Sequence, residues 1–106
     1  MQPPSTTPST TKRPPFSLGA SISAIYSETR WKMLAYLATE GASMVRELAG
    51  EARCSPNAAS RHLSELKAKG IVVQRKRLYQ LSDKLERPAP GQVDFGYFVA
   101  HFNVKG

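Results

Sequence analysis

The chain contains little cysteine and histidine, which limits the chemistry it can carry. Its 106 residues include one cysteine, Cys54, and two histidines, His62 and His101. A single cysteine cannot form a disulfide within the chain, which is typical of a reducing compartment. Cys54 and His62 cannot supply the four ligands of a structural zinc site without further partners at suitable spacing. We therefore expect no disulfide, no metal and no cofactor.

Long apolar runs and glycine-rich loops are also missing from the sequence. No stretch approaches the roughly 18 consecutive apolar residues of a membrane span, and the N-terminus lacks the apolar block of a secretory signal. We therefore expect a cytoplasmic protein with no membrane partner. No glycine-rich phosphate loop is present, and Ser60 and His62 are two positions apart on an expected helix, so they point in different directions. These absences argue against an enzyme.

Acidic residues are scarce in one part of the chain. The whole sequence has 15 Lys and Arg against 8 Asp and Glu, a formal net charge of +7. The segment from Arg53 to Arg77 holds seven basic residues and one acid, Glu65, so it carries +6 of that charge. Such a local excess suits a polyanion, and nucleic acid is the commonest one. A solvated basic surface is the alternative that charge alone leaves open.

Composition divides the chain into three parts. Residues 1–15 are mostly proline, serine and threonine with nothing to bury, so we predict a disordered tail. Residues 16–87 carry the periodic apolar patterns of a folded domain. Residues 88–106 begin as a linker and continue into an aromatic, β-branched stretch, Val93 to Val104, that predicts one strand. Both faces of that strand would be partly apolar, so we predict that it helps to form a dimer, together with the helix around Leu18 to Ile25.

The clearest single element is a helix from Ser55 to Gly70. Ser55 can cap it, and Pro56 suits the first helical position, where its missing N–H costs nothing. Gly70 can adopt the left-handed conformation that ends a helix. The residues that share its apolar face are Ala59, Leu63 and Leu66. His62 flanks this face, and we interpret it as a packed, hydrogen-bonded side chain rather than a metal ligand.

Three shorter patterns predict helices before it, and two β-type runs follow it. Leu18, Ile22 and Ile25 share one face of a helix within residues 16–26. Ser27 and Ser43 are expected to cap the second and third helices. A third helix joined to the Ser55 helix by a tight connection describes a helix-turn-helix. Residues 71–75 and 78–81 predict a hairpin with a cationic tip, whose turn type stays open because no Gly or Asn marks it.

The exposed face of the Ser55 helix and the hairpin tip carry the candidate contacts to nucleic acid. An Asn such as Asn57 can bond adenine bidentately, and an Arg such as Arg61 can bond guanine. Ser55 can hold a phosphate as well as cap the helix, and the tip suits phosphates or a minor groove. The predicted DNA-binding residues are Ser55, Asn57, Ser60, Arg61, Lys67, Arg75, Lys76 and Arg77. The alternatives are a polar surface helix and a hairpin edge kept soluble by charge.

Several short motifs follow one another between residues 20 and 82. They are Thr-Arg entering the second helix, Arg-Glu-Leu-Ala in the third, and Ser-x-x-x-x-Ser-Arg-His-Leu in the fourth. Leu-Lys-Ala-Lys-Gly-Ile-Val leaves the fourth helix, and Tyr-x-Leu lies in the hairpin. In this order and at these spacings, the segment resembles the winged helix-turn-helix regulators of the ArsR type.

The resemblance implies a mostly α fold with a small β-sheet, three to four helices and a β-hairpin wing, to which the residues themselves add the C-terminal strand. It implies a homodimeric transcriptional regulator of double-stranded DNA, with helix 55–69 in the major groove and wing 74–77 on the backbone or minor groove. The family favours a repressor. Its sensor cysteines lie in the helix before the turn, and Val45 to Ala52 contains none, while a lone His101 cannot supply the family's other metal site. We expect no metal sensing.

Two alternatives remain beside the DNA-binding regulator. Winged helices also serve as protein-interaction adaptors, and in that case DNA binding would be absent. A small-molecule effector could bind among the aromatic residues, which otherwise form core or dimer interface. Those residues are Trp31, Tyr79, Phe95, Tyr97, Phe98 and Phe102.

Overall fold

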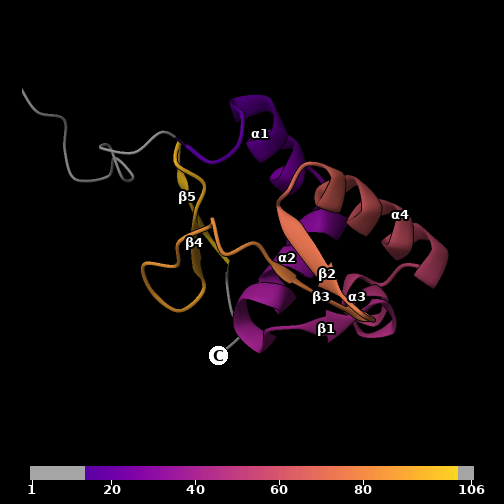
Figure 1. Cartoon of the computed structure of the whole chain (residues 1–106). Helices are drawn as coiled ribbons and strands as arrows, with labels where there is room; N and C mark the ends of the chain where they lie inside the picture. The colour runs from indigo at the N-terminus through magenta and orange to yellow at the C-terminus, as the bar shows by residue number, and fades with distance from the viewer. Residues whose placement is uncertain (1–13, 103–106) are drawn as a thin grey trace, which may run out of the picture.

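The computed structural model describes residues 14–102, so the predicted tail lies almost entirely outside the described residues. Four helices and five short strands follow one another in this part of the chain (Figure 1). They are α1 (Leu18–Tyr26), α2 (Glu28–Glu40), β1 (Ser43–Met44), α3 (Val45–Ala52), α4 (Pro56–Ala68), β2 (Val72–Arg75), β3 (Leu78–Leu81), β4 (Gln92–Asp94) and β5 (Val99–His101). No helix among them is long and apolar enough to cross a membrane.

The winged helix-turn-helix prediction is confirmed. Helices α3 and α4 form the helix-turn-helix, and β2 and β3 pair antiparallel as the wing. The sequence did not reveal β1, which adds Ser43 and Met44 to the free edge of β3 and gives a three-stranded sheet of order β1-β3-β2. Two residues alone join β2 to β3, Lys76 and Arg77.

Serine hydroxyls cap three of the four helices. The Oγ atoms of Ser17, Ser27 and Ser55 each accept a hydrogen bond from the backbone N–H three residues on, at 3.0–3.1 Å. The prediction that Ser43 caps α3 is wrong, because Ser43 lies in β1 and its hydroxyl donates to the carbonyl of Gly41. At α3 the N-cap is Met44, whose backbone N–H donates to Glu47 Oε1 at 2.8 Å.

Helix α4 ends as its glycine predicts. Gly70 has φ +82, which a residue with a Cβ rarely adopts. Its N–H donates to the carbonyl of Lys67, and the N–H of Ile71 donates to that of Leu66, at 2.9 and 3.0 Å. These two bonds form the Schellman arrangement that satisfies terminal carbonyls. The stop turns the chain directly into β2 and so places the wing next to α4.

The core lies between α2, α3, α4 and the sheet. Its buried side chains include the whole predicted apolar face of α4, Ala59, Leu63 and Leu66. Burying them supplies the main stabilisation of the domain, because each removes a large apolar area from water. The large, fully buried members from these elements and from the turn between α4 and β2 are Met33, Leu34, Leu37, Leu48, Leu63, Leu66, Ile71, Val72 and Leu81.

Helix α1 packs against the rest of the domain mainly by its small side chains. Its buried residues are Ser21 and Ala24, whereas Leu18 and Ile22 keep 48% and 44% of their surface exposed. The apolar spacing located the helix correctly, and of the three residues that share this spacing Ile25 packs, partly buried, against the core. An apolar stripe is therefore left on the surface of the chain.

The prediction of one strand from Val93 to Val104 is wrong within the described residues. Strands β4 and β5 form a two-stranded hairpin with each other, and Gly96 stands in the reversal between them. Gly96 has φ +94, and a Cβ there would lie 2.7 Å from Pro14, so this turn requires glycine. Its N–H donates to Asp94 Oδ1 at 2.7 Å. The apolar pattern of this segment therefore did not reveal the turn at Gly96.

The hairpin buries its apolar side chains against its own chain. Phe95 is fully buried and stacks on Phe98 with ring centroids 5.2 Å apart, and Phe102 lies 4.4 Å from Trp31 of α2. Figure 1 shows the hairpin at the opposite end of the molecule from α4. It therefore forms a second part of the core, away from the helix-turn-helix.

Candidate nucleic-acid interface

The outer face of α4 presents the predicted polar residues to solvent. Asn57, Ser60 and Arg61 are exposed, and the opposite face is buried in the core. Ser55 is also exposed, and its Oγ caps the helix by accepting from the N–H of Ala58. No hydrogen bond or ion pair joins the Asn57, Ser60 or Arg61 side chain to another residue within 14–102. These three side chains are thus available to an external partner.

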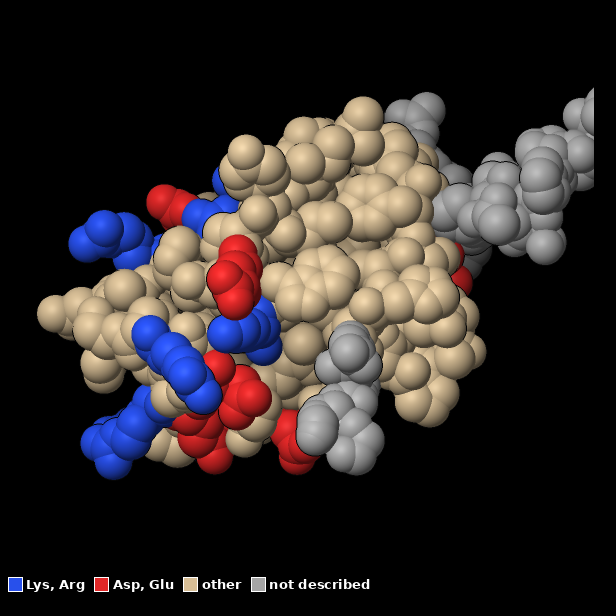
Figure 2. Space-filling model, turned by 180° about the vertical axis from the view of Figure 1, so that it is seen from behind, with Lys and Arg blue, Asp and Glu red and all other residues tan. Residues whose placement is uncertain are grey.

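The wing tip adds three exposed cations at the same end of the molecule, Arg75, Lys76 and Arg77. In Figure 2, which shows the back of the molecule, the blue side chains lie towards the left, with acidic side chains beside them. That end corresponds to the right of Figure 1, where the α3–α4 turn and the wing lie. The fold therefore brings two cationic segments of the sequence to one end.

Gln74 of β2 connects the end of α4 to the wing tip, and sequence reasoning missed it. Lys67 Nζ donates to Gln74 Oε1 at 2.8 Å, and Gln74 Nε2 donates to the carbonyl of Lys76 at 3.1 Å. Among the predicted DNA-binding cations, Lys67 is thus the one whose charged group already has a hydrogen-bond acceptor inside the described part of the chain. Gln74 could have been suspected from its place on β2, one residue before the basic tip.

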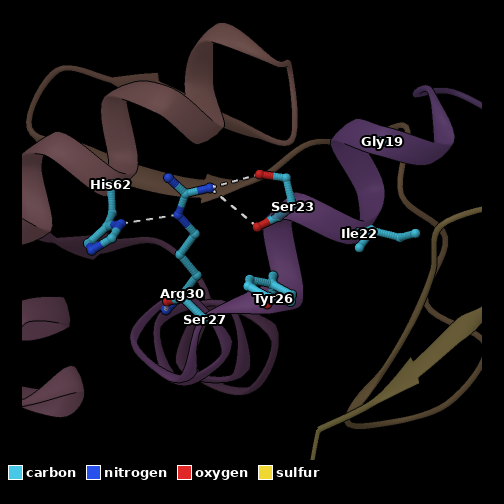
Figure 3. A pocket seen from close by; sticks show the side chains of 7 residues that line it. All are labelled: Gly19, Ile22, Ser23, Tyr26, Ser27, Arg30 and His62. Atoms are coloured by element: carbon cyan, nitrogen blue, oxygen red, sulfur yellow. Dashed lines mark hydrogen bonds between the residues drawn. The ribbon is translucent and has the colours of Figure 1, made fainter.

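A buried arginine of α2 joins α4 to α1 and α2 (Figure 3). Arg30 keeps 9% of its surface exposed, and its Nε donates to Nδ1 of His62 at 3.1 Å. Its Nη1 donates to the carbonyl and the hydroxyl of Ser23 at 3.3 and 3.2 Å, and its Nη2 pairs with Glu65. Charge-assisted bonds of this kind are stronger and more directional than neutral ones. Arg30 therefore sets the position of α4 through two of its residues.

His62 acts as an acceptor in this network, which confirms its interpretation as a packed, hydrogen-bonded residue. Burial lowers the pKa of His62 below its ordinary value of 6.5, and the nearby charges of Arg30 and Arg61 lower it further. The lowered pKa favours the neutral imidazole, and only a neutral ring leaves Nδ1 free to accept from Arg30. His62 thus links Arg30 to the face that carries Arg61.

The Arg30 network was not recognised from the sequence. Thr-Arg was noted only as a motif at the start of the second helix, and an arginine there resembles any solvated cation. The one indication of burial in the sequence is that Arg30 lies immediately before Trp31, on a helical turn that the core surrounds. Burial of a cation could not be inferred without knowing that Glu65 and His62 face it.

A pocket of about 480 Å³ opens beside this network. Figure 3 shows the side chains around it, contributed by α1, the start of α2 and α4. Its lining residues are Gly19, Ile22, Ser23, Tyr26, Ser27, Arg30 and His62. None of the aromatic residues predicted for an effector pocket lines it; Trp31 packs against Phe102 instead, and Phe95 stacks on Phe98. Those four belong to the core, as the alternative interpretation expected.

Metal-ligating side chains do not gather in the described residues. Across residues 14–102 no three His, Cys, Asp or Glu side chains lie close enough together to hold a metal ion. Cys54, partly buried in the α3–α4 turn, is a free thiol.

Comparison with known proteins identifies the segment that contains the helix-turn-helix. Residues 27–73 match the family model of the bacterial regulatory protein, arsR family. The match begins at the cap of α2, runs through α3 and α4, and ends in β2. No curated protein and no solved structure matches the chain. The matched segment, which holds the helix-turn-helix and the start of the wing, is thus similar to the bacterial regulatory proteins of the arsR family, and this similarity supports a DNA-binding regulator of transcription.

Proposed function

We propose that the chain binds a specific double-stranded DNA sequence as a homodimer and represses transcription. The observation that carries the proposal is the outer face of α4. It is exposed, held rigidly by a capped helix and the Arg30 network, and carries Asn57, Ser60 and Arg61 with no bonds to other described residues. A rigid helix with free polar side chains is the element that enters a major groove.

The side chains divide into two kinds of contact. Asn57 and Arg61 suit base edges, adenine and guanine respectively, with Ser60 beside them. The cations of the wing, with Lys67 and the hydroxyl of Ser55, suit phosphates, which fix the register of the protein without reading sequence. Gln74 ties the wing tip to Lys67 of α4, the helix that carries the base contacts, so that the wing has a defined position relative to that helix.

The proposal of a homodimer rests on the exposed apolar stripe of α1. Leu18, Ile22 and Tyr26 are spaced at i, i+4 and i+8 and expose 48%, 44% and 85% of their surfaces. Apolar residues gathered in this way mark contact surfaces more often than scattered ones do. The C-terminal segment, expected to supply the main dimer contact, buries most of its apolar side chains within its own chain, and Tyr97 remains 40% exposed. We therefore assign it a supporting role in the dimer.

The salt dependence of DNA binding tests this mode. A dimer with about 6–10 phosphate contacts releases enough counterions that its affinity for duplex falls about 10³–10⁵-fold between 50 and 200 mM salt. Fluorescence anisotropy with a labelled short duplex measures the dissociation constant across this range. Affinity that does not change with salt would exclude the proposed backbone contacts.

A further inference from the structure

We propose that Arg53, in the turn between α3 and α4, is a further contact to the DNA backbone. This inference rests on the proposed function, and it adds a residue that precedes α4 to the predicted set. The observation behind it is a backbone conformation that arginine does not favour.

Positive φ angles in the described residues follow a simple pattern. Glycine occupies four such positions, Gly41, Gly70, Gly91 and Gly96. The two other positions are Arg53 and Lys76, each with φ +58. A side chain is disfavoured in this region by the clash of its Cβ with the backbone. Both exceptions are cations. Arg53 lies in the turn that precedes α4, and Lys76 lies in the turn between β2 and β3 at the wing tip.

The geometry at Arg53 is the one that glycine supplies elsewhere in the chain. Arg53 ends α3 with φ 58 and ψ 47, and its N–H donates to the carbonyl of Gly50 at 3.2 Å. The next N–H, of Cys54, donates to the carbonyl of Ala49 at 3.0 Å. This repeats the pair of bonds that Gly70 and Ile71 make at the end of α4. Glycine would therefore satisfy the backbone at position 53 without strain.

The side chain of Arg53 does not compensate by a contact within the described part of the chain. It is exposed, and no hydrogen bond or ion pair connects it to another residue there. Backbone strain of this kind persists where a side chain has a task that the fold alone does not require. Arg53 stands two residues before Ser55, in the turn that leads into the exposed face of α4. A guanidinium at that place can pair with a phosphate beside the groove that α4 enters.

A structural alternative assigns Arg53 to the fold alone. A cation at the C-terminal end of α3 also interacts favourably with the helix dipole. Arg53→Gly separates the two roles through two measurements: loss of the charge lowers the salt slope of DNA binding if Arg53 contacts the backbone, and lowers stability if Arg53 serves the helix dipole. Arg53→Lys keeps the charge and the strain. The matched control is Arg87→Gln, which removes one exposed positive charge from the loop between β3 and β4.

The experiment measures urea unfolding and the salt dependence of DNA binding for these three variants and the parent chain. For Arg53→Gly we expect an unfolding midpoint at or above that of the parent. We also expect severalfold weaker DNA binding, by the same factor for specific and non-specific duplexes. The slope of log affinity against log salt concentration should be smaller by about 0.9 per lost contact. Arg53→Lys should keep most of the slope, and Arg87→Gln all of it.

Three outcomes would overturn the inference, and they are distinguishable. If the parent binds duplex with the expected salt dependence and Arg53→Gly has the same slope, Arg53 makes no backbone contact. If Arg53→Gly lowers the unfolding midpoint and leaves the slope unchanged, the residue serves the end of α3. If the parent itself shows no salt-dependent binding, the proposed function fails, and this inference fails with it.

Discussion

Arg61→Glu is expected to abolish specific DNA binding while the protein stays folded. Arg61 is exposed on α4 and has no bond to another described residue, so its replacement leaves the core and the caps intact. A bidentate pair between arginine and guanine contributes about 1–3 kcal/mol, and a homodimer would lose two of them. The new carboxylates would also repel the DNA. Because 1.4 kcal/mol corresponds to a tenfold change, we expect affinity to fall by about 100-fold or more.

The control for this variant is Arg87→Glu, which makes the same change of charge at an exposed arginine far along the chain. Anisotropy titrations should give near-parental affinity for the control, and circular dichroism should show the same helix content for both. If Arg61→Glu binds duplex like the control, the face of α4 does not read DNA. Such a result would favour the protein-interaction adaptor over the regulator proposed here.

Phe95→Ala is expected to have the largest effect on stability, lowering the free energy of unfolding by about 3–5 kcal/mol. Phe95 is fully buried in the reversal between β4 and β5 and stacks on Phe98. Its removal leaves a cavity in the part of the core that joins the C-terminal hairpin to the rest of the domain. Urea denaturation followed by circular dichroism measures the loss.

Tyr97→Ala is the matched control, because it removes an aromatic ring from the same turn where 40% of the side chain is exposed. We expect this change to cost about 1 kcal/mol or less. Equal losses for the two variants would show that the hairpin does not pack on the core as described. A small loss for both would return the C-terminal segment to its sequence-based role as a contact between subunits.

Features that depend on local chemistry could be predicted from the sequence. The caps at Ser27 and Ser55, the stop at Gly70 and the wing hairpin all follow from which residues satisfy a helix end or suit a strand. The exposed face of α4 followed from its helical period. These parts of the fold need little knowledge of what surrounds them.

Features that depend on tertiary contacts could not be predicted in this way. The apolar spacing of α1 located the helix, but it could not show that Ser21 and Ala24 pack inward while Leu18 and Ile22 remain exposed. The reversal at Gly96 was hidden inside an apolar pattern that also fits one strand. The burial of Arg30 depends on partners 32 and 35 residues further along the chain, which no local pattern contains.

The central claim is that two copies of α4 read a specific DNA sequence in the major groove. Selection of bound duplexes from a random pool, followed by sequencing, tests it most directly. We expect enrichment of an inverted repeat whose half-sites are centred one helical turn, about 10–10.5 base pairs, or a multiple of it apart. Enrichment of one half-site without symmetry would contradict the homodimer, and a pool that remains random would contradict sequence-specific binding by α4.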